Sequence, residues 1–80
     1  MLDRIKVRPR LHEILKERGL TQMQLAEMSG VSIAAVNRFD KNVRHEDAHL
    51  FAIARALNLR VEELFEVEYL DENEKFSDRY

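Results

Sequence analysis

Apolar residues recur along the chain with the spacing of amphipathic helices. The clearest stripe is Leu11, Ile14 and Leu15, on one face of a helix expected over 11–18, with Gly19 as its stop. Further helices are expected as two short segments within 21–38, one from 46 or 47 to Asn58, and one over about 61–65. The positions expected to face inward are Leu25, Ala26, Met28, Val36, Phe39, Leu50, Ile53, Ala54, Leu57, Val61, Leu64 and Phe65.

The two helices within 21–38 are expected to meet at a tight turn. The Thr21 hydroxyl is placed to cap the first helix, and Gln24, three residues on, completes a capping box. Gly30 falls where the chain reverses, at a position that favours a positive φ and where we expect a Cβ to be crowded. Ser32 is placed to cap the second helix. The outward face of that helix is made of Ile33, Ala34, Asn37, Arg38 and Lys41.

Both ends of the helical region show the alternation of strands. Residues 5–8 alternate apolar and basic side chains, and residues 65–69 alternate apolar and acidic ones. If the two segments pair as an antiparallel ribbon, Lys6 and Arg8 lie across from Glu66 and Glu68. The alternative is an arm and a tail that fray. Beyond Leu70 the polar composition predicts disorder unless Phe76 or Tyr80 docks.

The composition fits one small domain without cross-links. Eighty residues suffice for a single core, and the lack of cysteine excludes disulfides and thiolate metal sites. No apolar run approaches the roughly 18 residues of a membrane span. The N-terminal residues lack the continuous apolar stretch of a signal peptide. We therefore expect a cytoplasmic protein that does not associate with membranes.

The net charge of −2 is unevenly distributed. Residues 1–60 hold 11 Lys and Arg against 7 Asp and Glu, whereas residues 61–80 hold 2 against 8, so that the balances are +4 and −6. A basic body suits an anionic partner such as nucleic acid, and the acidic end suits a solubilising, partner-binding or competing segment. The alternative is that the acidic residues only form a solvated face.

One motif points to a different chemistry. His45, Glu46 and His49 match H-E-x-x-H, in which two histidines one helical turn apart bind zinc and the glutamate activates water. The pattern fixes only three positions and falls where a helix is just beginning. We therefore expect no metal site and no cofactor. His12 is expected to be a packed or surface imidazole, and the absence of a recognisable catalytic arrangement predicts that the protein is not an enzyme.

The stretch ERGLTQMQLAEMSGVSIAAVNRF, followed by LFAIARALNLRVEELFE, resembles the helix-turn-helix domain of the lambda repressor and Cro family, also called XRE-type regulators. The resemblance covers about Leu11 to Glu66. A compact linker makes the chain most similar to the short, single-domain subgroup. The resemblance implies an all-α or mainly α fold, with a compact five-helix domain over 1–70. The small terminal strand pair belongs to this domain if it forms, and 71–80 are expected to be an acidic, flexible tail.

The resemblance also implies a DNA-binding surface with a recognition helix at about 32–39. Arg38 is the strongest candidate for base recognition, because a guanidinium binds both acceptors of a guanine. The matching base-contact positions are Ser32, Ile33, Ala34, Asn37 and Arg38. The positions that match phosphate contacts are Thr21, Gln22, Lys41, Asn42 and Arg44.

Three positions depart from the family pattern. Ile33 replaces a glutamine that commonly cooperates with the residue matching Gln22, so that this pair cannot form and apolar contact with thymine methyl groups is expected instead. The loop glycine that relatives often carry is either replaced by Asn42 or removed by the shorter connection, so the resemblance does not fix the placement of Lys41 and Arg44. Arg60 stands where a capping serine often begins the last helix, which is therefore expected to be marginal.

Two functions follow from the resemblance. The first is a sequence-specific regulator, most simply a repressor that binds an inverted-repeat operator as a homodimer, in a bacterial, phage or plasmid setting. The dimer is expected to use the last helix, the terminal strands, or both. The second is a protein-interaction module of the same fold, such as an antitoxin, anti-repressor or co-regulator. In that case the recognition helix or the acidic tail contacts a protein partner.

Overall fold

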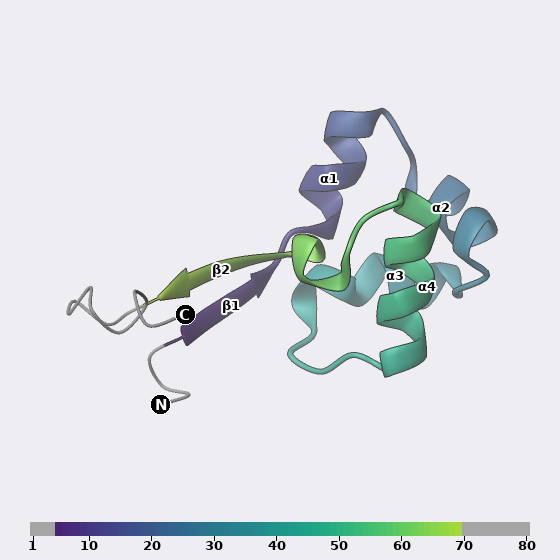
Figure 1. Cartoon of the computed structure of the whole chain (residues 1–80). Coiled ribbons are helices and arrows are strands. Elements are labelled where there is room, and N and C mark those ends of the chain that lie inside the picture. Colours follow the sequence, from purple (N-terminus) through teal and green to yellow (C-terminus); the bar gives the residue numbers. More distant parts are fainter. Residues whose placement is uncertain (1–4, 70–80) are drawn as a thin grey trace.

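Four α-helices and a two-stranded antiparallel sheet make up the computed structural model, which describes residues 5–69 (Figure 1). In chain order the elements are β1 (Ile5–Pro9), α1 (Leu11–Arg18), α2 (Gln22–Ser29), α3 (Ile33–Arg38), the 3-10 turn η2 (Phe39–Lys41), α4 (Asp47–Leu57), the 3-10 turn η3 (Val61–Leu64) and β2 (Phe65–Tyr69). Helices α2 and α3, with the turn between them, form one unit of the helical body, and α1 and α4 form the rest of it.

The predicted apolar stripes meet in one core. Every α-helix and both 3-10 turns contribute to it, and within residues 5–69 no polar or charged side chain is buried. Burial of these side chains is the main stabilising contribution, because apolar surface leaves water as the helices pack. The buried residues are Leu11, Ile14, Leu15, Leu25, Val31, Val36, Phe39, Ile53, Ala54, Leu57 and Leu64.

Three residues in the left-handed region end the helices. Gly19 (φ 67°) and Gly30 (φ 78°) follow α1 and α2, and Asn58 (φ 60°) follows α4. These predicted stops are confirmed. The expected crowding at Gly30 is wrong, because a Cβ at this position would meet nothing within 4 Å. The glycine is favoured by the backbone conformation alone.

Two further expectations are corrected. Met28 does not face inward but is 51% exposed. In α2 the fully buried residue is Leu25 and Ala26 packs against the core beside it, so that Met28 lies outside the buried stripe. The fifth helix is the 3-10 turn η3, because only four residues separate Arg60 from the start of β2 and Arg60 offers no short capping side chain.

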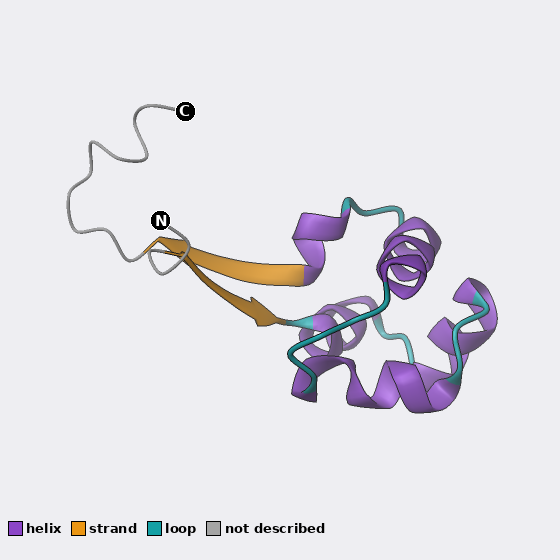
Figure 2. Ribbon diagram, turned by 90° about the horizontal axis from the view of Figure 1, so that it is seen from below, coloured by secondary structure: helices purple, strands orange, loops and turns teal. Residues whose placement is uncertain are grey.

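The terminal segments form the predicted ribbon. Val7 lies opposite Val67, and Arg8 lies opposite Glu66 with an ion pair between their side chains. Figures 1 and 2 show the two strands as an arm that projects from the helical body. The base of the arm is tied to the body by a hydrogen bond from the Arg10 N–H to the Leu64 carbonyl, 3.0 Å long.

The predicted acidic tail at 71–80, with Phe76 and Tyr80, lies outside the described residues. Within residues 5–69, no helix has both the length and the apolar composition that crossing a membrane requires.

Candidate nucleic-acid interface

The unit formed by α2, α3 and the turn between them is fixed by the predicted caps. The Gln24 N–H donates to Oγ1 of Thr21 (3.0 Å), and the Thr21 N–H donates to Oε1 of Gln24 (2.8 Å), which completes the capping box. The Ala35 N–H donates to Oγ of Ser32 (3.1 Å) at the start of α3. Val36 is the α3 residue that anchors this helix in the core. The opposite face of α3 is thereby left to solvent.

All five residues predicted to contact bases lie on this outward surface. Ser32, Ile33, Ala34, Asn37 and Arg38 are each exposed. Ile33 is 45% exposed, which makes it an apolar side chain presented to solvent beside polar ones. Among the described residues, no acidic side chain forms an ion pair with Arg38, so its guanidinium keeps its donors for a partner.

The residues predicted to contact phosphates flank α3 on both sides. Thr21 and Gln22 lie at the N-terminus of α2, where backbone N–H groups favour anions; Thr21 is exposed and Gln22 is half-buried. Lys41, Asn42 and Arg44 are exposed on the segment that follows α3. With Arg38 they place three cations in a stretch of seven residues, which favours a polyanion at this end of α3.

The polar partner of Gln22 was missed in the sequence. Ile33 does remove the usual glutamine, but Nδ2 of Asn37 donates to Oε1 of Gln22 at 3.0 Å. On the other side, Nε2 of Gln22 lies 3.0 Å from Nε2 of His12. The glutamine pair is absent, as Ile33 requires, and Asn37 is the α3 partner of Gln22 instead. The available signal was spacing, since residues 33 and 37 are one helical turn apart and share a face.

A second polar contact was also not predicted from the sequence. The carboxylate of Asp40, in η2, accepts from the Leu11 N–H (2.8 Å) and from the His12 N–H (2.9 Å). It thus caps α1, whose own N-cap residue Arg10 forms no side-chain cap. The contact joins positions 28 and 29 residues apart, so no local capping pattern could indicate it. It ties η2, which directly follows α3, to the start of α1.

The H-E-x-x-H segment is not presented on one helix. His45 precedes α4, its Nε2 lies 2.8 Å from the carbonyl oxygen of Phe39, and its ring stacks on Phe39 at a centroid distance of 4.2 Å. His49 lies on α4 and pairs with Glu46, 3.7 Å away. Among residues 5–69 no three potential metal ligands come together. The segment positions the loop after α3, and the expectation of no metal stays a prediction.

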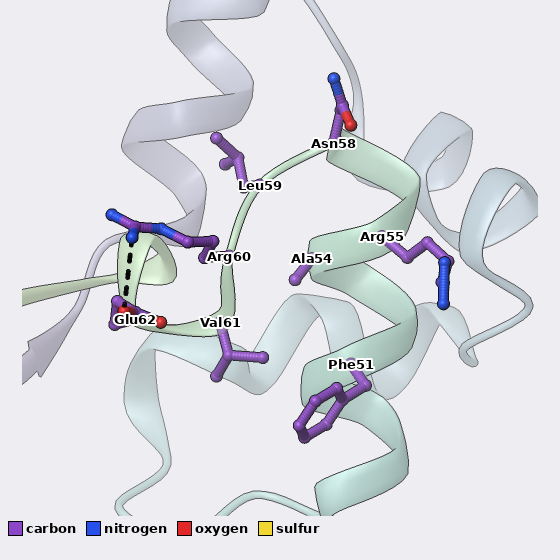
Figure 3. A pocket seen from close by; sticks show the side chains of 8 residues that line it. All are labelled: Phe51, Ala54, Arg55, Asn58, Leu59, Arg60, Val61 and Glu62. Atoms are coloured by element: carbon purple, nitrogen blue, oxygen red, sulfur yellow. Dashed lines mark ion pairs between the residues drawn. The ribbon is translucent and has the colours of Figure 1, made fainter.

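A shallow groove of about 430 Å³ lies beside α4, between that helix and the segment that leads into η3 (Figure 3). Phe51 and Ala54 line it from α4, and Leu59 and Val61 line it from the following segment. Its polar rim includes an ion pair between Arg60 and Glu62, whose charged atoms are 4.0 Å apart. The lining contains no nucleophile paired with a base, so it offers no evident catalytic chemistry.

A family model described as the Cro/C1-type HTH DNA-binding domain matches residues 10–69, from the start of α1 to the end of β2. That range is 60 of the 80 residues. No curated protein and no solved structure matches the chain.

Proposed function

The chain belongs to the Cro/C1-type helix-turn-helix DNA-binding domain family, and we propose that it is a repressor that binds an inverted-repeat operator as a homodimer. Membership of this family supports a DNA-binding regulator. Helix-turn-helix domains of this type are typically non-enzymatic. The operator, the direction of regulation and the dimer are our proposal.

The outward face of α3 is the observation that carries the proposal. It combines Arg38, which has no acidic partner among the described residues, with the exposed apolar side chain of Ile33. In the major groove, a guanidinium suits the two acceptors of a guanine, and the branched aliphatic side chain of isoleucine suits a thymine methyl group. The DNA phosphates on either side of this groove are then contacted by the residues before and after α3, which are Thr21, Gln22, Lys41, Asn42 and Arg44. The proposed orientation thus places α3 along the major groove.

A homodimer is proposed because one reading head of this size contacts few base pairs. Two heads on half-sites about one helical turn apart double the contacts and explain an inverted repeat. Two exposed apolar surfaces are available outside the α2–α3 unit. They are the ribbon face that carries Val7, Val67 and Tyr69, and the groove beside Phe51.

The second candidate is a protein-interaction module. It is favoured by the exposed apolar residues of the α2–α3 unit, since Met23, Met28 and Ile33 are all largely accessible. Exposed methionines suit adaptable protein contacts. In this case the partner of α3 is a protein, and DNA affinity is weak and independent of sequence.

A selection from random duplex DNA separates the two candidates. A regulator enriches a short inverted repeat, binds it with an affinity that falls steeply as salt rises, and protects two half-sites. Arg38→Ala is expected to relax the preference at one base pair of each half-site and to lower affinity about five- to hundredfold, the range of one bidentate base contact.

The matched control is Arg55→Ala, which removes the same charge from α4; because Arg55 also lines the groove offered above as a dimer surface, its oligomeric state is measured alongside by sedimentation. It is expected to weaken binding only slightly and to leave the base preference unchanged. Enrichment of no sequence at all would rule out the regulator. Equal effects of the two variants would rule out Arg38 as a base-reading residue.

A further inference from the structure

A line of hydrogen-bonding side chains runs from the outward face of α3 to α1. It passes from Asn37 through Gln22 to His12, whose Nδ1 lies 3.5 Å from Oδ2 of Asp40 in η2. We propose that His12 is a positioning residue that sets the direction of the Gln22 and Asn37 side-chain amides and so makes DNA recognition dependent on pH. This inference rests on the proposed function, since it concerns the same reading surface.

The hydrogen bonds define which imidazole nitrogen carries the proton. Oε1 of Gln22 accepts from Nδ2 of Asn37, so the NH2 group of Gln22 faces Nε2 of His12 at 3.0 Å. An amide NH2 only donates, so Nε2 has to accept. This arrangement of the amide requires an Nε2 without a proton, which in the neutral imidazole leaves the proton on Nδ1.

The other side of the ring supports this tautomer. Nδ1 of His12 lies 3.5 Å from Oδ2 of Asp40, a carboxylate already held by the N–H groups of Leu11 and His12. The acceptor on this side is therefore fixed, whereas the amide on the other side can rotate. The charged groups around the ring are Asp40 from η2 and Lys16, one turn further along α1, while α2 contributes the neutral Gln22.

Protonation of His12 reverses the requirement at Nε2. The charged ring donates from both nitrogens, so an NH2 group opposite Nε2 becomes a donor facing a donor. Rotation of the Gln22 amide by half a turn restores the bond, because its oxygen then faces His12. Its NH2 group now faces Asn37, whose amide has to rotate as well and accept with Oδ1.

The two states present different groups on the outward surface. With neutral His12, Asn37 uses one N–H toward Gln22 and its Oδ1 is available as an acceptor. With charged His12, Oδ1 is used and the NH2 group is available as a donor. Asn37 is exposed on α3, so the proton on His12 changes what the recognition helix offers to a base or a phosphate.

NMR of the free, full-length protein tests the link directly. Between pH 5 and 8, the range in which imidazoles commonly gain a proton, the side-chain amide signals of Gln22 and Asn37 are expected to shift with the same midpoint as the His12 ring. In His12→Gln a neutral amide stands near the position of Nε2, and these shifts are expected to disappear. The control is His49→Gln, which removes another imidazole and should leave them in place.

DNA binding gives the second measurement. The ratio of operator affinity to the affinity for unrelated duplex is expected to change about two- to twelvefold over this pH range, the effect of one hydrogen bond. His12→Gln should abolish the change and His49→Gln should retain it. An unchanged pH dependence in His12→Gln, or amide signals that do not follow His12, would overturn the inference. If no operator is enriched, the proposed function fails, and the NMR titration still decides whether His12 sets the amides.

Discussion

Individual side chains determine what α3 offers to a partner. Ile33 takes the place of a hydrogen-bonding residue and leaves Asn37 as the α3 partner of Gln22. Under the proposed function, base recognition is therefore expected to depend on Arg38 and on apolar contact, while the side chain of Asn37 is bonded to Gln22 of α2. This division gives each residue a separate experimental signature.

A contact between Ile33 and a thymine methyl group can be tested by removing the methyl group from the DNA. Replacing the contacted thymine by deoxyuridine is expected to weaken wild-type binding about fourfold, the value of one buried methyl group. Ile33→Ala should bind more weakly from the outset and be insensitive to the replacement. Affinities are measured by titration on matched duplexes. An equal loss in both proteins would contradict the contact.

The cap provided by Asp40 is expected to stabilise the fold. Asp40→Ala leaves the first two N–H groups of α1 without their acceptor and should lower the free energy of unfolding by about 1–2 kcal/mol, as for other lost caps. Urea denaturation followed by circular dichroism measures the change. Glu27→Ala, at an exposed position of α2, is the control and should stay within about 0.5 kcal/mol. If the two variants were equally stable, the cap would have no energetic role.

At the scale of elements, chain reversals define the α2–α3 unit. Gly30 adopts φ 78° between the two helices, and no neighbouring atom would obstruct a Cβ there. A substitution at this position therefore tests backbone conformation without a steric clash. The geometry of the turn in turn sets the angle at which α3 is presented.

Gly30→Ala is expected to cost about 1–2 kcal/mol, the penalty of the left-handed conformation for an ordinary residue. Gly30→Asn should cost less, because asparagine adopts this conformation more readily. The same denaturation experiment ranks the three proteins. Equal losses for alanine and asparagine would show that the cost has another origin.

The ribbon is an element whose strength depends on its attachment. Isolated two-stranded ribbons are marginal in water. Here the pairing of Val7 with Val67 is continued into the body by the bond between the Arg10 N–H and the Leu64 carbonyl. The Arg8–Glu66 pair adds cross-strand attraction, which salt screens because both side chains are exposed.

At the scale of the whole molecule, charge is distributed along the chain with opposite signs. The first 60 residues have a balance of +4, and the last 20 have a balance of −6. A polyanion bound at α3 is attracted by the first part and repelled by the second. We therefore expect the acidic segment to lower the affinity for DNA through long-range electrostatics.

Removal of residues 71–80 changes the net charge from −2 to 0, since the segment carries four acidic and two basic residues. DNA affinity is expected to rise several-fold at low salt. The gain should vanish as the ionic strength is raised to the physiological value, where the Debye length is about 8 Å, and beyond it. A full-length variant with only Asp71 and Glu72 replaced by their amides also has a net charge of 0 and should behave like the truncated protein. A gain that persisted at high salt would contradict an electrostatic origin.

The sequence by itself determined four of the helices, their ends and most of the core, because these depend on local spacing and local backbone preference; Val31, which is buried, was not predicted to face inward. The stripe of Leu11, Ile14 and Leu15, the stop at Gly19 and the box of Thr21 with Gln24 all concern residues a few positions apart. The strand pair was predicted as one of two alternatives, because alternation indicates strands without indicating a partner. The predictions that Met28 faces inward and that the last element is an α-helix were wrong, because the extent of the core and the room for a full helical turn depend on packing.

Only the tertiary structure decided how the reading face is supported. Asn37 on α3, Gln22 on α2, His12 on α1 and Asp40 on η2 form one line of polar contacts, although they belong to four elements. Side-chain hydrogen bonds act over about 3 Å, so they form only after apolar burial has brought the helices together. The sequence thus specified which residues face outward, and the packing of the helices specified which of them hold one another in place.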